Sequence, residues 1–427
     1  MKNWLQFPKV RFSEYSVPGL HVVLQIVVAI SNFVISPVII NNLGTTPYTL
    51  WITINAFAGL LLMADWGFLN TFRVSMTEIY LQNNFFAREM WKMVTRTLHF
   101  SAAMGVVALA ILLHGMQLIP QDSQSRNILL VIIAILTAYF TLLEHLYIVK
   151  YQVLGFEIKS TSILIVDRIF EGIFQIIFLI IHPDLYTIFV LTLIFRFGSF
   201  MTLFLCLPRT SHILQSNIEY QVSMLKVVKQ STGAFMFVLS NVAYANILTL
   251  VLSKMLATDF FVVVQLSRTI VSPIRMIGSS ISLGTLQNRL KETFYKRLGS
   301  QTLEVRNELH IFYILSISAI ILSLASSHIW NIFFPNISGF NQFLVSLFAF
   351  QYVLDSLIWM YSRDFYNANR LFKLGLCNLL LSGVSVLSIP FVNLYLEVVS
   401  VPLTLILFDL IFLFLITNQK GKKWLYR

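Results

Sequence analysis

The sequence is poor in the residues on which soluble enzymes and secreted domains depend. Charged residues make up only 11% of its 427 positions, against roughly 25% in a soluble globular domain. Its two cysteines, Cys206 and Cys377, lie in apolar runs without neighbours at metal-ligand spacing, which excludes a disulfide framework and a zinc site. No glycine-rich phosphate-binding motif occurs, so we expect no nucleotide hydrolysis and no cofactor.

Long hydrophobic runs take the place of these features. Hydrophobic residues make up 57% of the chain, and a bilayer-spanning helix needs about 20 of them in succession. We therefore predict an all-α polytopic membrane protein with about twelve transmembrane helices. The first run follows Lys2, Lys9 and Arg11 and is long enough to be a retained helix rather than a signal peptide. The predicted spans are 20–41, 48–72, 97–118, 127–149, 161–181, 185–207, 231–253, 260–286, 308–333, 341–362, 374–393 and 396–417.

The distribution of lysine and arginine gives an independent test of this count. With twelve spans, 24 of the 30 basic residues lie in the terminal segments and alternate connections on one side, and only Arg126 and Lys254 lie on the other. Positive residues concentrate on the cytoplasmic side, so we predict cytoplasmic termini in a bacterial inner membrane. The net charge of +11 then reflects topology and contact with anionic lipids, and no nucleic-acid partner is expected.

The two halves of the chain resemble each other weakly. VIINNLGTTPY runs from Val38 to Tyr48, and VLSKMLATDFF runs from Val251 to Phe261. This offset is half the chain length, as a tandem repeat of six helices requires. We predict two six-helix lobes, residues 1–212 and 213–427, around a central cavity. The connections 74–96 and 287–307 mix basic with apolar residues, which favours helices lying on the membrane surface over solvated loops.

Ten charged residues fall inside predicted spans and away from their ends. Each is disfavoured in lipid by roughly 3 kcal/mol on insertion scales, so they must face one another or a wet cavity. The basic ones are Arg168, Arg196, Arg268 and Arg275. The acidic ones are Asp65, Glu144, Asp167, Glu171, Asp355 and Asp409, which are candidates for binding H⁺ or Na⁺ in coupled transport or for serving as counter-ions of the arginines.

The eighth predicted helix carries the clearest polar face. Gln265, Arg268, Ser272, Arg275 and Ser279 follow one another at spacings of three and four, so they share one side. Gln25 and Asn32 lie on a related face of the first helix. Because the arginine fork suits phosphate or carboxylate, we predict that Arg268, Arg275, Arg196, Arg168, Gln265, Ser272, Gln25 and Asn32 bind a polar or anionic cargo. The alternative is that these groups only join helices.

Residues 42–72 carry a family resemblance. They read NLGTTPYTLWITINAFAGLLLMADWGFLNTF, and Leu43, Gly44, Tyr48, Leu50, Trp51, Asp65, Gly67 and Phe68 match a pattern common in the polysaccharide transport (Wzx-like) flippases of the MOP exporter superfamily. The chain departs from that pattern at Thr49, where a small residue is usual. It also departs at Ala257, the second-lobe counterpart of Gly44.

The resemblance implies a MOP/MATE-like fold and a flippase rather than an enzyme. Such a protein moves undecaprenyl-diphosphate-linked oligosaccharide, an O-antigen or other surface polysaccharide unit, to the periplasmic leaflet by alternating access. It implies membrane lipids, the lipid-linked oligosaccharide, a polysaccharide polymerase and chain-length machinery as partners, and a functional monomer. The alternatives are a MATE-like drug or metabolite antiporter, a membrane-embedded polymerase or ligase, and a non-transporting scaffold.

Overall fold

The described part of the computed structural model is a bundle of long helices. The structure describes residues 13–61, 124–154, 156–207, 244–296, 308–366, 371–396 and 399–424, with scattered residues in 91–105 and 236–240. The helices are α1 (Ser13–Leu43), α2 (Thr45–Leu61), α5 (Gln124–Val153), α6 (Glu157–Ile181), α7 (Leu185–Leu205), α9 (Thr258–Lys296), α10 (Glu308–Phe333), α11 (Gln342–Tyr366), α12 (Leu371–Leu396) and α13 (Ser400–Trp424).

The described residues of all twelve predicted spans are helical, apart from residues 206–207 and 341 at the ends of two spans. Ten correspond to the helices above, and the third and seventh correspond to helical residues within 91–105 and to 244–255. Seven helices of the described part are long and apolar enough to cross a membrane. In lipid every backbone polar group must be satisfied within its own segment, which a helix achieves. The prediction of an all-α, multi-pass membrane protein is confirmed.

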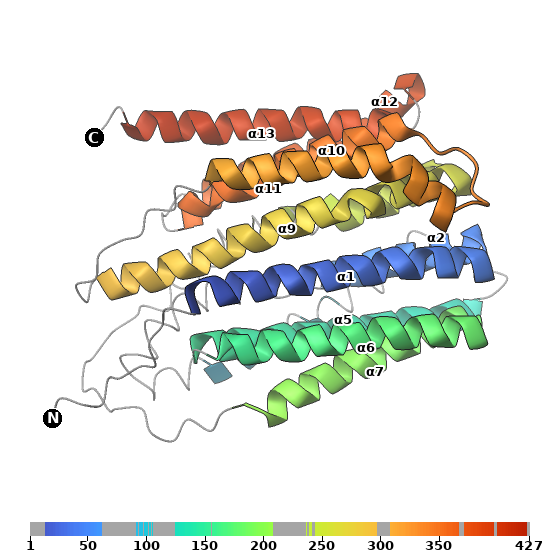
Figure 1. Cartoon of the computed structure of the whole chain (residues 1–427), viewed down its shortest axis with the longest axis horizontal. Helices are drawn as coiled ribbons and strands as arrows, with labels where there is room; N and C mark the ends of the chain where they lie inside the picture. The colour runs from blue at the N-terminus through green and yellow to red at the C-terminus, as the bar shows by residue number, and fades with distance from the viewer. Residues whose placement is uncertain are drawn as a thin grey trace.

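The helices run side by side in two groups that meet at α1 (Figure 1). We call α1, α2, α5, α6 and α7 the amino-terminal lobe, and residues 244–255 with α9 to α13 the carboxy-terminal lobe. α1 packs against α6 in its own lobe and against α9 in the other. The predicted boundary at residue 212 lies outside the described residues, so its position stays a prediction.

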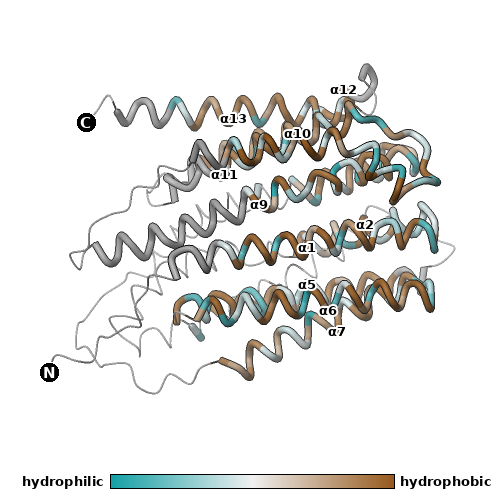
Figure 2. Tube along the Cα trace, in the orientation of Figure 1, coloured by the Kyte–Doolittle hydropathy of each residue, from teal (hydrophilic) through white to brown (hydrophobic). Residues whose placement is uncertain are grey.

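The outward faces of the helices are apolar, as contact with lipid requires. Hydrophobic residues follow the described helices along most of their length (Figure 2). Large apolar side chains such as Ile181, Leu205 and Phe391 are more than 70% exposed, whereas a soluble bundle would bury such groups. The bundle therefore exposes apolar side chains to the hydrocarbon of the membrane and buries its polar side chains in the interior.

The turn between α1 and α2 depends on one glycine. Gly44 has a φ of +95°, and its backbone N–H donates to the carbonyl of Ile40 at 2.9 Å. This left-handed residue ends α1 as a C-terminal cap, and α2 begins directly after it at Thr45. The match of Gly44 to the family pattern thus has a local physical cause, because residues that carry a Cβ are strained at this φ.

One prediction about the connections is wrong in its described part. Residues 287–296 are not a separate helix on the membrane surface, since they continue α9 from Thr258 to Lys296 as one helix (Figure 1). No glycine or proline interrupts the chain between 287 and 296, so nothing forces the helix to end there. Residues 74–90 and 297–307 of the two predicted surface segments lie outside the described residues.

Candidate functional site

Helix α6 carries its polar side inward. Its buried residues recur every three or four positions, as one helical face requires, while Ile169, Phe170 and Phe174 on the other face are at least 40% exposed. This arrangement is the reverse of a soluble amphipathic helix, and it places charged groups where they can pair away from lipid. The buried residues are Glu157, Ser160, Thr161, Leu164, Arg168, Glu171, Gly172, Gln175 and Leu179.

The first charge cluster, which we call the amino-terminal cluster, joins α5, α6 and α7. It consists of Glu144, Asp167, Arg168, Glu171 and Arg196. Arg168 donates to Glu144 and, through Nη1, to Asp167 and Glu171, both at 2.9 Å. The Arg196 guanidinium lies 3.2 Å from Glu171 Oε2 and 3.9 Å from Glu144 Oε2. With every group ionised, three carboxylates face two guanidinium groups, so the cluster carries one excess negative charge.

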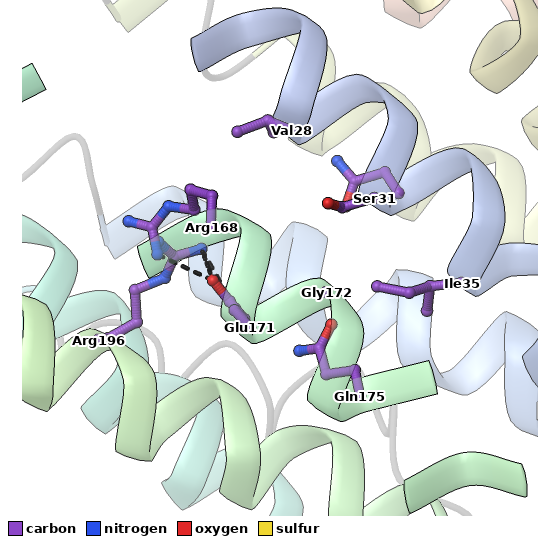
Figure 3. A pocket seen from close by; sticks show the side chains of 9 residues that line it. Val28, Ser31, Ile35, Arg168, Glu171, Gly172, Gln175 and Arg196 are labelled. Atoms are coloured by element: carbon purple, nitrogen blue, oxygen red, sulfur yellow. Dashed lines mark hydrogen bonds and ion pairs between the residues drawn. The ribbon is translucent and has the colours of Figure 1, made fainter. Parts of the chain in front are cut away.

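A small cavity lies beside this cluster, between α1 and the α6–α7 pair (Figure 3). Its volume is about 40 Å³, enough for about three or four waters at roughly 10 to 15 Å³ each. Figure 3 shows Arg168, Arg196 and Glu171 on one side of it and Ser31 of α1 opposite. The lining residues are Val28, Ser31, Asn32, Ile35, Arg168, Glu171, Gly172, Gln175 and Arg196. The cluster is thus accessible to small polar species rather than sealed in hydrocarbon.

Close packing of α1 on α6 holds this cavity in shape. A Cβ built on Gly172 would lie 2.7 Å from Ser31 Oγ, so the glycine lets the two helices approach closely without displacing that hydroxyl. Nearer the amino-terminal ends of both helices, His21 Nε2 lies 3.1 Å from Glu157 Oε1. Gln175 Nε2 donates to Thr192 Oγ1 at 2.7 Å and joins α6 to α7.

The second charge cluster, the carboxy-terminal cluster, joins α9, α11 and α13. Arg275 Nε lies 2.6 Å from Asp355 Oδ2, and its guanidinium carbon lies 5.9 Å from the centre of the Tyr352 ring. Asp409 Oδ2 accepts a hydrogen bond from Gln351 Nε2 at 2.8 Å. Arg275 of α9 therefore has an ion-pair partner within the protein, the carboxylate of Asp355 on α11.

Arg268 differs from the other intramembrane arginines. Its three hydrogen bonds, to Tyr352 Oη at 3.4 Å and to Thr249 Oγ1 and Gln265 Oε1 at 3.3 Å, are long and go to neutral oxygens. No carboxylate forms an ion pair with it among the residues that the structure describes. Beside it, the Nε2 group of Gln265 is buried without a hydrogen-bond partner in the described structure. Arg268 and Gln265 thus offer unused donors to an anion.

The structure brings most of the predicted site residues into these two clusters. Asn32 lines the cavity with Arg168 and Arg196, whereas the Ser272 hydroxyl donates to the Thr269 carbonyl of its own helix. Gln25 is half-buried on α1; Asp65 lies outside the described residues. Arg168 and Glu171, which lie three residues apart on α6, form an ion pair. The assignment of these residues to cargo or to a coupling ion stays a prediction.

Tyr352, Gln351 and Thr249 were not predicted as site residues. Tyr352 and Gln351 lie one turn before Asp355 on α11, so a search for polar groups on the face of that carboxylate would have found them. Thr249 carries no such signal, because the predicted span 231–253 contains no charged residue that would mark a polar face. Only its packing against α9 places it within reach of Arg268.

Comparisons with known proteins place the fold. No protein-family model matches the sequence, and no curated protein matches it. Solved structures do. A mutant of the Vibrio cholerae MATE transporter VcmN superposes with a TM-score of 0.62 at 12% identity, over 97% of this chain and 99% of that one.

Two further structures agree with this match. A MOP superfamily transporter from Pyrococcus furiosus, described as having a binding pocket of reverse polarity, gives a TM-score of 0.59 at 12% identity, over 96% of this chain and 95% of that one. An outward-facing multidrug resistance MATE family transporter gives 0.58 at 12% identity, over 96% and 95%. The chain is thus a polytopic helical membrane protein with buried charge clusters, and its fold is that of the MATE and MOP transporters.

Proposed function

We propose that the protein is an exporter that works by alternating access and carries a cargo with an anionic group. Proteins of the same fold are transporters by name, which supports transport over catalysis. The observation that carries the anionic cargo is Arg268, whose charge meets no carboxylate among the described residues. An arginine held by long bonds to neutral groups gains a charge-assisted bond when an oxyanion arrives.

The more specific proposal is a flippase for undecaprenyl-diphosphate-linked oligosaccharide. The resemblance of residues 42–72 to Wzx-like flippases supports it, and a diphosphate is the oxyanion that such a cargo would present to Arg268 and the unpartnered amide of Gln265. Arg275 is paired with Asp355, so Arg268 is the arginine of α9 whose charge is left for the cargo among the described residues. The bacterial inner membrane is the location that this cargo requires.

A MATE-like drug or metabolite antiporter is the second candidate. Two observations favour it: MATE transporters are among the solved structures with this fold, and the amino-terminal cluster has one more carboxylate than guanidinium groups. An excess of carboxylate suits a cationic cargo or a coupling cation. In either case we propose that carboxylates of the two clusters couple transport to H⁺ or Na⁺.

The decisive experiment compares variants of Arg268 in the purified protein. Arg268→Ala should weaken binding of a fluorescent undecaprenyl-diphosphate-linked sugar roughly 10- to 100-fold, because a charged hydrogen bond is lost, while Arg268→Lys keeps the charge and most of the binding. Lys159→Ala is the matched control. It also removes one positive charge, but from an exposed side chain that lies outside both clusters and donates to the Cys206 carbonyl.

Equal binding of the probe by the wild type and Arg268→Ala would show that Arg268 does not bind the anionic group. Proteoliposomes that export ethidium but do not flip the lipid-linked probe would support the antiporter. The same vesicles test coupling, since transport that is indifferent to imposed proton and sodium gradients would contradict it.

A further inference from the structure

Aromatic rings form a continuous row along the surface between α5 and α7, and we call this row the aromatic strip. Its rings follow one another in the order Phe197, Phe140, Phe200, Tyr147 and Phe204, with successive centroids 5.1, 6.0, 5.6 and 5.7 Å apart. Phe197 is 43% exposed and Phe204 is 50% exposed, and α7 lies at the edge of the bundle (Figure 1). The strip therefore faces the lipid.

A lysine lies at the Tyr147 end of the strip. Lys150 Nζ is 5.7 Å from the centre of the Tyr147 ring and 5.0 Å from the centre of the Trp91 ring. The lysine is half-buried, and its ammonium makes no hydrogen bond and no ion pair within the part of the chain that the structure describes. Ring faces attract a cation but accept hydrogen bonds only weakly, and an ammonium has three N–H donors. Lys150 is thus left with donors for an oxyanion.

Lys150 and the strip occupy one half of the membrane. Lys150 lies in the last turn of α5, and α6 then begins at Glu157, which contacts His21 near the start of α1. This is the end of the bundle at which α1 begins and α13 ends (Figure 1). Phe140 precedes Lys150 by ten residues, or about 15 Å along the helix, which is half of a hydrocarbon core of about 30 Å. The strip is as long as one leaflet is thick.

The acids on either side of Lys150 in the chain are engaged elsewhere. Glu144 accepts a hydrogen bond from Arg168, and Glu157 Oε1 lies 3.1 Å from His21 Nε2. Both carboxylates are at most 3% exposed, so neither reaches the surface of the strip. The described residues thus leave a positive charge unneutralised at one end of an apolar surface, and an anionic lipid complements both features.

We propose that Lys150 and the aromatic strip bind one anionic phospholipid of the predicted cytoplasmic leaflet. The phosphate accepts hydrogen bonds from the Lys150 ammonium, and an acyl chain lies along the rings from Phe204 to Phe197. The cytoplasmic leaflet supplies anionic lipids to basic residues beside the membrane, whereas a zwitterionic lipid would bring a second cation close to Lys150. The site lies on the other lobe from Arg268, so it does not depend on the identity of the cargo.

Native mass spectrometry of the purified full chain tests this site. Dioleoyl phosphatidylglycerol should bind about 10-fold more tightly than dioleoyl phosphatidylcholine. Lys150→Gln should weaken binding of the glycerol lipid about 10-fold, because a charge-assisted hydrogen bond is lost, and should leave the choline lipid unchanged. Phe197→Ala removes the ring farthest from Lys150. It should weaken dioleoyl phosphatidylglycerol about 3-fold but not the dihexanoyl lipid, whose chains are too short to reach that ring.

Lys254→Gln is the matched control, because it removes one positive charge from an exposed residue that is predicted to lie on the opposite side of the membrane. Lys150→Arg keeps the charge and should keep the binding. Melting temperatures in detergent identify any variant that does not fold. Equal affinity for the two dioleoyl lipids, or equal losses in Lys150→Gln and Lys254→Gln, overturns the site. Undecaprenyl phosphate that binds more tightly than phosphatidylglycerol, and loses this affinity in Lys150→Gln, overturns the assignment to a phospholipid.

Discussion

At the scale of single residues, the intramembrane charges separate into paired and unpaired groups. Arg168 holds three carboxylates on two helices, and Arg275 holds one, whereas Arg268 contacts only neutral oxygens among the described residues. Removing one partner of a buried ion pair is far more damaging than the pair is stabilising, because the remaining charge is left without a counter-ion. The arginines should therefore respond differently to mutation.

Arg168→Ala should destabilise the protein by about 3 to 5 kcal/mol, the usual effect of leaving a buried partner unpaired. Its loss leaves Glu144, which is 2% exposed, with only the more distant Arg196 guanidinium. Thermal or denaturant unfolding in detergent measures the change. Arg268→Ala is the comparison, and it should be much less destabilising because no carboxylate of the described structure depends on it. A similar loss in both variants would contradict this division.

At the scale of the helices, glycines serve two purposes. Gly172 allows α1 to lie on α6, because a Cβ there would meet Ser31 at 2.7 Å, and Gly59 of α2 does the same against Asn246 of the other lobe. Gly44 instead provides a backbone conformation, with a φ of +95° and no atom within 4 Å of a Cβ. Space and backbone strain are thus separate reasons for a glycine, and they predict different results for the same substitution.

Gly44→Ala should destabilise the protein by about 1 kcal/mol, because alanine is strained at a positive φ. Gly198→Ala should stabilise it by about 0.5 to 1 kcal/mol, since this glycine lies within α7 and a Cβ there meets nothing within 4 Å. Melting temperatures of the two variants, measured side by side, should shift in opposite directions. A shift of the same sign in both would show that backbone conformation does not decide the outcome at Gly44.

At the scale of the whole molecule, the fold could be predicted from the sequence, but the pairing of its charges could not. Each span is a local property, because apolar length and backbone satisfaction in lipid are set by consecutive residues. The partners of Arg168 and Arg275 depend on which helices become neighbours. Glu144 lies 24 residues from Arg168, and the Tyr352 contact of Arg268 lies 84 residues away. Helical periodicity predicted which face of a helix carries these arginines, but it could not predict which residues of other helices contact that face.

α1 begins and α13 ends at the same end of the bundle (Figure 1), in agreement with an even number of spans. The excess of lysine and arginine on that side predicts that it is cytoplasmic. Green fluorescent protein fused after Arg427 should therefore fluoresce, and alkaline phosphatase at the same position should be inactive. Active phosphatase with a dark fluorescent fusion would contradict the predicted orientation.

The inward polar side of α6 has a consequence for how the protein is made. Within α6, Arg168 pairs with both Asp167 and Glu171, which leaves this helix with one excess negative charge, disfavoured in lipid by roughly 3 kcal/mol near the centre. Its further ion-pair partners come from α5, which is synthesised before it, and from α7, which is synthesised after it. We therefore expect α6 to stay beside α5 until Arg196 of α7 has been translated, so that these ion pairs form as the three helices enter lipid together.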